Sequence, residues 1–418
     1  MSGGRRRRPQ HTLQSAGCCA MKIARVEAFH VAAPGDYQAS AGLRVPTVQV
    51  EATPPRALDA NTGRHLCVYP PRAETLLVRI TTDDGYAGWG EAHSPPVPAV
   101  SKAIVEQLFA PQLIGQDPLA IEVLWDRLYA SMRLRGHNTG FMLEALAGVD
   151  IALWDLAGKL MGQPIYRLLG GPFRTAIPCY ASGVPGTTPD ERIEAARRQV
   201  ALGFTTVKLS IGRQSLARDL ELAEALAHAL RGEADVLVDA HGCYDARTAV
   251  EAGRRLERAG VRWLEDPLPP EDLEGYAALC AALDLPVASG ETECTRWQFH
   301  QKLRRRAADI ILPDICRAGG ISEGRKIALV ADLFNVPWCA HVSIGSWIHL
   351  AAAVHLAAAS PNFLLCEYPN PLAHNPLGDP LFTRGLTRSG GAIHLPEGPG
   401  LGLTIDEDAV RAHTVPHA

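Results

Sequence analysis

From residue 176 onward, short apolar runs alternate with longer stretches in which apolar residues recur every three or four positions. The short runs predict β-strands, and the longer stretches, such as 189–203 and 245–260, predict amphipathic helices. A helix fits between each neighbouring pair of strands, but the segment after the last strand is too proline-rich for one. The pattern therefore predicts an α/β barrel of eight parallel strands and seven helices. The expected strands are 177–182, 204–210, 235–240, 261–266, 286–291, 309–314, 336–341 and 363–368.

The part of the chain before the barrel follows a different pattern. Residues 22–33 and 74–92 are predicted to form strands, the second folded into a hairpin around an Asp-Asp-Gly turn. Helical periodicity dominates 100–170 and is clearest over 142–162, where a Gly-Gln-Pro sequence stops the helix. This part is therefore predicted to be a separate α+β domain.

These patterns divide the chain into four parts. We expect a capping domain over 21–172, the barrel over 173–368, and a C-terminal segment, 369–418, that returns to the cap. Residues 1–20 are polar and basic and lack the apolar stretch of a signal peptide, so we expect a disordered extension there. The connection 36–73 is long, rich in proline and glycine and without periodicity, which suggests a lid over a functional site.

Composition mainly excludes classes of function. The net charge of −4 and the pI near 6.4 argue against nucleic-acid and membrane-surface partners. No apolar run approaches the length of a membrane span. The ten cysteines are scattered and include no Cys-x-x-Cys pair, so we expect free thiols and, with them, a cytoplasmic location.

Five acidic residues and one histidine stand at the ends of six consecutive predicted strands. They follow one another at intervals of 23 to 27 residues, about the length of one strand, one helix and two loops. In a parallel barrel the carboxyl ends of all strands face one mouth, where the active sites of such barrels lie. The spacing therefore predicts that the six groups meet in one active site: Asp239, Glu265, Glu291, Asp314, His341 and Glu367.

The first three of these residues are predicted to bind a metal ion. The carboxylates of Asp239, Glu265 and Glu291 would lie close together on adjacent strands, and like charges that close cannot all stay ionised without a cation between them. Oxygen ligands with open coordination positions suit Mg²⁺. Acids at strand ends can also cap the following helix, but three in register favour the metal.

The other groups form a candidate acid–base set. Asp314 and His341 end neighbouring strands, so the carboxylate can orient the imidazole and raise its basicity, which makes His341 the predicted general base. Glu367 could donate a proton or a hydrogen bond to a developing enolate oxygen. Lys208, the charged residue of the second strand, could hold a substrate carboxylate or serve as the counter-ion of the acidic cluster.

Taken together, these residues resemble the enolase superfamily and, within it, the mandelate racemase/muconate lactonizing enzyme subgroup. The resemblance covers nearly everything from Met21 onward and includes the sequence GVDIALWDLAGKLMGQPIYRLLGG, the three metal-ligand candidates, the Asp314–His341 pair and Glu367 in CEYP. It implies a modified TIM barrel, (β/α)7β, with an α+β capping domain formed by the N- and C-terminal segments. It also implies one Mg²⁺ and removal of the proton alpha to a carboxylate by a Lys or His base.

Two departures from the common pattern of this family distinguish among its reactions. Many relatives carry Lys-x-Lys on the second strand, where this chain has Lys208-Leu209-Ser210, and the role of Ser210 is open. The missing second lysine disfavours two-base racemases, muconate-type cycloisomerases and dipeptide epimerases. His241, two residues after Asp239, resembles instead the acid sugar dehydratases acting on galactonate and mannonate, where this histidine is thought to protonate the departing hydroxyl.

The resulting hypothesis is a hydro-lyase, a Mg²⁺-dependent dehydratase that acts on a sugar acid (an aldonate or aldarate). His341 would remove the C2 proton, Lys208 and Glu367 would stabilise the enediolate, and His241 or protonated His341 would help the 3-hydroxyl to leave, giving a 2-keto-3-deoxy acid. One alternative is an epimerase, racemase or cycloisomerase of a sugar acid or lactone that forms the same enolate. The other is a non-catalytic barrel, which the complete site disfavours.

The pattern does not specify which sugar acid is the substrate. Specificity in such barrels comes from the cap, and related barrels imply a homo-oligomer, from a dimer to an octamer. Basic residues of the cap are the candidates for contacts to the far end of the substrate: Arg44, His65, Arg72, Arg133, Arg135 and His137.

Overall fold

The computed structural model describes residues 21–33, 72–95, 97–212 and 214–416. The predicted extension 1–20 and nearly all of the predicted lid 36–73 lie outside these residues, as do two cap candidates, Arg44 and His65. Within the described ranges, no helix has both the length and the apolar character needed to cross a membrane.

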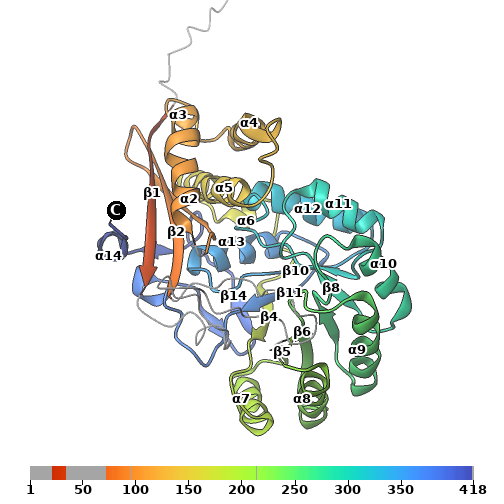
Figure 1. Cartoon of the computed structure of the whole chain (residues 1–418). Coiled ribbons are helices and arrows are strands. Elements are labelled where there is room, and N and C mark those ends of the chain that lie inside the picture. Colours follow the sequence, from red (N-terminus) through yellow and green to blue (C-terminus); the bar gives the residue numbers. More distant parts are fainter. Residues whose placement is uncertain (1–20, 34–71, 96, 213, 417–418) are drawn as a thin grey trace, which may run out of the picture.

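Eight parallel strands form a closed barrel at the centre of the molecule (Figure 1). In chain order they are β4 (Ala176–Ser182), β5 (Thr206–Ser210), β6 (Asp235–Asp239), β7 (Trp263–Glu265), β8 (Val287–Ser289), β9 (Ile310–Ile311), β10 (Trp338–Ala340) and β11 (Phe363–Tyr368). Consecutive strands pair with one another, and β11 closes the barrel against β4. In the described part of this region, seven helices connect the strands, as predicted: α7 (Pro189–Ala201), α8 (Leu216–Ala229), α9 (Ala246–Ala259), α10 (Leu273–Ala282), α11 (Arg296–Arg304), α12 (Gly320–Leu333) and α13 (Trp347–Ala358).

Helix α9 shows how the local sequence sets the ends and the buried face of a barrel helix. It begins after Asp245, whose side chain accepts a 2.8 Å hydrogen bond from Thr248 N, and it ends at Gly260, where φ is 85°. Ala249 and Leu256 on its inner face are fully buried in the barrel core. The spacing of these apolar positions gives the helix one face that packs inward.

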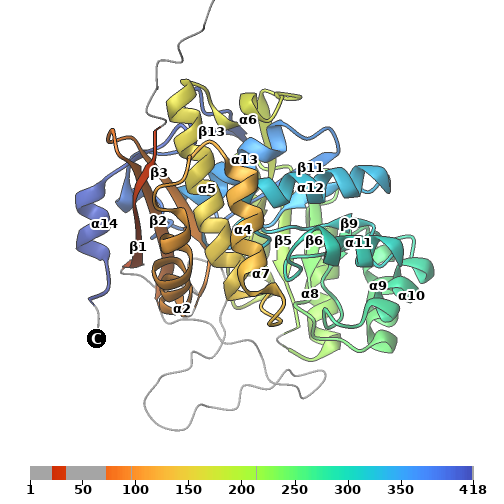
Figure 2. The same ribbon diagram turned by 90° about the horizontal axis from the view of Figure 1, so that it is seen from above.

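The cap is an antiparallel sheet covered by helices (Figure 2). The long helix α5 lies between this sheet and barrel helix α12. Glycine is required where β3 crosses α5, because a Cβ on Gly90 would lie 1.9 Å from the carbonyl oxygen of Gly148. The strands are β1 (Ile23–Ala33), β2 (Ala73–Thr82) and β3 (Ala87–Ala92), and the helices are α2 (Pro98–Ala103), the π-helical turn η1 (Ile104–Phe109), α3 (Ala110–Leu113), α4 (Ile121–Arg133), α5 (Phe141–Met161) and α6 (Ile165–Leu168).

The C-terminal segment leaves the barrel after β11 and contacts both parts of the molecule. Helix α14 lies beside β1 (Figures 1 and 2), and Leu401 N donates a 2.8 Å hydrogen bond to Asp155 of α5. Strand β14 pairs with the first residues of β4, so a hairpin extends the barrel sheet, which the sequence pattern did not predict. The elements are η2 (Asp379–Leu381), β12 (Phe382–Arg384), β13 (Arg388–Ser389), β14 (Ala392–His394), β15 (Thr404–Ile405) and α14 (Glu407–His413).

A buried histidine on α13 should make stability depend on pH. His355 is fully buried, its Nδ1 accepts a 3.2 Å hydrogen bond from Tyr166 N, and burial lowers its pKa from 6.5 to about 4. Between these two values the unfolded state binds more protons than the folded state, so the free energy of unfolding falls as the pH drops from 6.5 through 4. The complete loss amounts to about 3 kcal/mol.

Replacing this histidine should therefore flatten the pH dependence. For His355→Gln we expect the urea midpoint to change less between pH 6.5 and pH 4 than it does in the parent protein. Urea unfolding at a series of pH values measures this difference. A variant whose midpoint falls as steeply as that of the parent would show that another group causes the acid destabilisation.

Candidate active site

Two of the three predicted metal ligands end adjacent strands at the carboxyl end of the barrel, and the third follows the next strand. Asp239 is the last residue of β6, Glu265 is the last residue of β7, and the two are partners in the strand register. Glu291 lies two residues beyond the end of β8 and follows Gly290, whose φ is 135°. The third carboxylate is therefore carried by a loop, where the sequence had predicted a strand end.

The acid–base candidates occupy the neighbouring positions of the same mouth. Asp314 and His341 form an isolated parallel bridge beyond the ends of β9 and β10, so they are adjacent, as predicted. Glu367 lies within β11, and Lys208 lies in the middle of β5. His241 follows β6 with a φ of 50°, a backbone conformation that is uncommon for residues other than glycine.

A continuous network of close polar contacts joins all eight candidate catalytic and metal-binding residues. It runs from the end of β6 across the barrel to the loops after β8, β9 and β10. The network places residues that are far apart in the sequence within one group of interacting charges. His241 Nδ1 lies 2.5 Å from Asp239 Oδ1. Lys208 Nζ lies near three carboxylates, at 3.3 Å from Asp239 Oδ2, 2.5 Å from Glu265 Oε1 and 3.2 Å from Glu367 Oε1. His341 Nε2 lies 3.7 Å from Glu367 Oε2 and 3.0 Å from Glu291 Oε2, and its Nδ1 lies 2.8 Å from Asp314 Oδ2.

Lys208 is the buried cation at the centre of this network. Burial alone would lower its pKa, but the charges of Glu265 and Glu367 raise it well above the usual value, so the ammonium group stays protonated. Burial raises the pKa of Glu265 well above its usual value, and the negative charges of Asp239 and Glu367 add to this effect. One ammonium group shared by three buried carboxylates leaves the cluster with an excess of negative charge.

This excess of negative charge fits a divalent cation. Asp239, Glu265 and Glu291 offer oxygen donors, the ligand type that Mg²⁺ prefers. Glu265 also accepts a 3.1 Å hydrogen bond from Trp263 Nε1, which holds its carboxylate inside the barrel. In the present structure Glu291 is turned toward His341, with 3.0 Å between Glu291 Oε2 and His341 Nε2.

His341 is held on both sides by carboxylates. Its Nδ1 lies 2.8 Å from Asp314 Oδ2, so its Nε2 faces Glu291 and Glu367 on the mouth side. Burial would lower the pKa of His341, but the charges of Glu291 and Glu367 and the hydrogen bond to Asp314 raise it well above the usual value. A cation bound at these carboxylates would oppose that rise and favour the neutral imidazole that a general base requires.

Glu367 is held by donors that the sequence did not reveal. Ser182 Oγ donates a 2.5 Å hydrogen bond to Glu367 Oε1, while Val342 N and Ser343 N donate to Oε2 at 2.8 and 3.0 Å. Burial opposes ionisation of Glu367, yet Lys208 and His341 hold its pKa well below the usual value. Ser182 is the last residue of the first barrel strand, and this position indicates a place at the barrel mouth without identifying Glu367 as its partner.

The cap candidates within the described residues lie in local contacts or on the surface. Arg72 Nε lies 2.5 Å from Glu74 Oε1, and the guanidinium of Arg133 lies over the rings of Tyr129 and Trp297. Arg135 and His137 are exposed. No contact in this structure links these four residues to the network, so their role in specificity stays a prediction.

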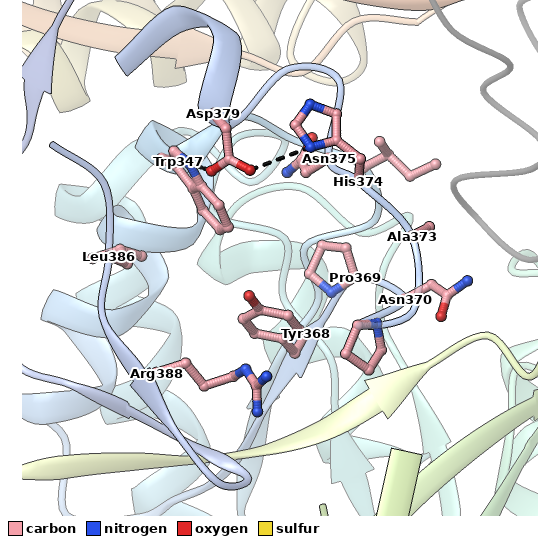
Figure 3. Close-up of a pocket in the computed structure, with 12 residues that line it drawn as sticks. Trp347, Tyr368, Pro369, Asn370, Ala373, His374, Asn375, Asp379, Leu386 and Arg388 are labelled. Atoms are coloured by element: carbon pink, nitrogen blue, oxygen red, sulfur yellow. Dashed lines mark hydrogen bonds and ion pairs between the residues drawn. The ribbon is translucent and has the colours of Figure 1, made fainter. Parts of the chain in front are cut away.

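A separate cavity of about 420 Å³ lies between the loop after β10 and the segment that follows β11 (Figure 3). Trp347, Tyr368 and Arg388 point into it, and His374 Nδ1 lies 3.3 Å from Asp379 Oδ2 at one side. None of the eight network residues lines this cavity. The metal-binding and acid–base candidates all lie in the network at the barrel mouth, so we take the network, and not this cavity, as the candidate active site.

The fold and the site together define a class of enzyme. A closed barrel of eight strands and seven helices, an α+β cap, and acidic residues with a His–Asp pair at the mouth are the features of enolase-type enzymes. Residues 68–170 match the model of the mandelate racemase/muconate lactonizing enzyme N-terminal domain, and residues 191–409 match that of the enolase C-terminal domain-like family. The chain belongs to the mandelate racemase/muconate lactonizing enzyme family of the enolase superfamily.

Individual relatives show which reactions occur among similar chains. D-galactarolactone cycloisomerase of Agrobacterium fabrum is 37% identical over 82% of this chain and 92% of its own length. Arabinonate dehydratase of Saccharolobus solfataricus is 34% identical over 83% of this chain and 92% of its own length. The crystal structure of a racemase from Streptomyces coelicolor A3(2) with bound magnesium superposes with a TM-score of 0.79 at 26% identity, covering 94% of this chain and all of that one.

Proposed function

We propose that the protein is a Mg²⁺-dependent dehydratase of a sugar acid (an aldonate or aldarate). The observation that carries the proposal is the presence of two histidines at different carboxylates of one network, His341 at Glu291 and His241 at Asp239. Dehydration needs one group that removes a proton and another that delivers one, and the two histidines can divide these tasks. The relatives named above support a sugar acid or its lactone as the substrate class.

The first step is removal of the C2 proton. Asp314 holds Nδ1 of His341, so Nε2, which faces Glu291 at 3.0 Å in this structure, is the atom that accepts the proton from the substrate. The ammonium group of Lys208 stabilises the negative charge that moves onto the substrate carboxylate as the enediolate forms. Mg²⁺ held by Asp239, Glu265 and Glu291 would supply further positive charge to the same carboxylate.

The second step is loss of the 3-hydroxyl as water. His241 donates a proton to the departing oxygen while the electron pair of the enediolate forms the C2–C3 double bond. The resulting enol takes up a proton at C3 and becomes the 2-keto-3-deoxy acid. Because Lys208 and His341 hold the pKa of Glu367 well below its usual value, we assign Glu367 to hold Lys208 and the loop after β10 rather than to donate this proton.

The specific alternative is a cycloisomerase, which the similarity to D-galactarolactone cycloisomerase favours. Such an enzyme would use His341 and the same enediolate, but its product would be an isomer of the substrate rather than a keto acid. Ser210, which stands where many relatives have a second lysine, lies at the end of β5, and its role is open in both cases. Because one reaction gives a keto acid and the other an isomer of the substrate, identifying the product distinguishes them directly.

A substrate screen tests the proposal. We expect purified protein with Mg²⁺ to form a 2-keto acid, detected as its semicarbazone, from at least one compound in a library of aldonates, aldarates and uronates. The same library with sugar lactones added, followed by NMR in D₂O, tests the alternative. Isomerisation or C2 deuterium exchange without keto acid would reject the dehydratase and support the cycloisomerase or an epimerase.

Replacing His241 should separate the two chemical steps. For His241→Asn we expect dehydration to fall by about 10²–10⁴-fold, because the acid for the leaving hydroxyl is lost. Exchange of the C2 proton in D₂O should continue, because His341 and Asp314 are unchanged. Product assay and exchange rate are measured on the same substrate. Undiminished dehydration would transfer the role of acid to His341.

A further inference from the structure

Asp314 contacts a second histidine besides His341. Its Oδ2 lies 2.8 Å from His341 Nδ1, and its Oδ1 lies 3.0 Å from Nε2 of His349. Oδ1 also accepts hydrogen bonds from the backbone N–H groups of Cys316 (2.9 Å) and Arg317 (3.1 Å). The His349 contact is short, but in the described residues neither ring nitrogen of His349 has a partner that meets hydrogen-bond geometry.

The imidazole of His349 is held in a fully buried site between the barrel and the cap. It lies in the first turn of α13, and the loop before the helix leaves room for the ring, because a Cβ on Gly345 would lie 2.3 Å from His349 Nδ1. The ring of His93, from the end of β3, lies 5.3 Å away between centroids. Because the ring is buried, a hydrogen bond from its Nε2 to Asp314 Oδ1, 3.0 Å away, is an interaction that can orient it.

The cap holds the start of α13 through one carboxylate. Glu91 of β3 accepts hydrogen bonds from the backbone N–H groups of Ser346 and His349, both at 3.1 Å, and from the hydroxyls of Ser346 (2.6 Å) and Thr75 (2.7 Å). These bonds place a carboxylate at the N-terminus of a helix, where its charge is favourable. A continuous set of contacts thus runs from the cap through α13 to Asp314 and the base.

A metal centre is the other interpretation of this cluster. In the described residues, Glu91, Cys316 and His349 place one potential ligand atom each within 4.8 Å of the others. The oxygens of Glu91 are already occupied by the four hydrogen bonds given above, and burial raises the pKa of the Cys316 thiol well above its usual value. A thiol that stays protonated and a carboxylate saturated with donors are poor ligands, so the cluster fits hydrogen bonding better than metal binding.

We propose that His349 is a positioning residue for the catalytic base: with a proton on Nε2, it donates to Asp314 Oδ1 and fixes the carboxylate so that Oδ2 holds His341 Nδ1–H. Asp314 then keeps Nε2 of His341 pointed at the substrate. The effect on turnover rests on the proposed function, in which His341 is the base. The effect on the His341 hydrogen bond does not depend on the substrate.

The test compares two substitutions at this position. In His349→Phe the ring remains but the N–H is lost, whereas in His349→Gln the side-chain amide can place an N–H near the former Nε2. We expect kcat to fall about 10–100-fold in the phenylalanine variant, with KM within a few-fold, and to recover largely in the glutamine variant. The matched control is His355→Gln. His355 is a buried histidine on the same helix and contacts Tyr166, so this variant should keep the parent kcat.

NMR of the metal-free protein labelled with ¹⁵N-histidine supplies the second readout. We expect the spectrum to show His349 protonated on Nε2 and the Nδ1–H signal of His341 shifted downfield, with that shift lost in His349→Phe and regained in His349→Gln. A parent spectrum with His349 protonated on Nδ1 would overturn the proposal even if the variants failed to fold. A folded phenylalanine variant with unchanged kcat and an unchanged His341 signal would overturn it as well. A changed signal with no sugar acid turned over would leave the positioning role standing and reject only the proposed function.

Discussion

Replacing His341 with asparagine is expected to lower kcat by about 10²–10⁴-fold, the usual contribution of a general base. The amide of asparagine can still donate to Asp314, but no group then remains at the position of Nε2 to accept the C2 proton. Both dehydration and C2 deuterium exchange should be lost, because both begin with this proton transfer. The measurement is kcat and the exchange rate on the substrate that the screen identifies.

Two controls distinguish loss of the base from loss of the fold. The variant should keep the thermal unfolding temperature of the parent within a few degrees and should still bind Mg²⁺, since Asp239, Glu265 and Glu291 are unchanged. His228→Asn, at an exposed histidine of α8, should behave like the parent in every assay. Residual activity within ten-fold of the parent would show that another group removes the C2 proton.

The second large effect is expected on stability, from replacing Lys208 with methionine. The ammonium group lies within 3.3 Å of Asp239, Glu265 and Glu367, and the change would leave these buried carboxylates without their shared cation. Breaking a buried ion pair in this way costs about 3–5 kcal/mol. Protonation of Glu265, whose pKa burial already raises well above its usual value, would offset part of that cost.

The dependence of this stability loss on Mg²⁺ is a second, more specific prediction. We expect the loss of stability of Lys208→Met to be largest in EDTA and to shrink with added Mg²⁺, because a cation bound by Asp239, Glu265 and Glu291 would replace part of the missing charge. Thermal unfolding with and without Mg²⁺ measures the difference. Arg262→Met, which breaks an exposed ion pair with Asp235, should cost less than about 1 kcal/mol and should not respond to Mg²⁺. Equal stability of Lys208→Met and the parent in EDTA would show that the cluster does not carry the charges we assign to it.

The barrel and the positions of its candidate site residues could be predicted from the sequence because strands and strand-end residues both recur at a regular interval. Each strand and helix follows the last at a nearly constant interval, and in a parallel barrel the end of every strand must lie on the same side. That rule was sufficient to select His341, Asp314 and the carboxylates without knowledge of any contact. The prediction placed Glu291 and Asp314 on strand ends, whereas the structure places them in loops beyond β8 and β9, because element boundaries depend on backbone geometry that residue patterns do not determine.

The network that joins these residues depends on contacts between distant parts of the chain. Lys208 interacts with Glu265 and Glu367 across the barrel, and Ser182 of the first strand meets Glu367 of the last only because the barrel closes. A serine at a strand end has no periodicity or spacing that marks it as a partner of a carboxylate far along the chain. Such pairs are determined by the closure of the sheet and by the length of each side chain.

The sequence by itself determined the class of fold, the side of the barrel on which the candidate site lies and the residue types present there. Hydrophobic periodicity and the residue types at strand ends are local properties, and they can be recognised in the sequence without knowledge of the tertiary structure. Only the tertiary structure decided that one lysine is shared by three carboxylates, that the cap reaches the start of α13 through Glu91, and that His349 lies against Asp314. The physical reason is that the charge state and orientation of a buried group depend on every neighbour within a few ångströms, and those neighbours come from distant segments of the chain.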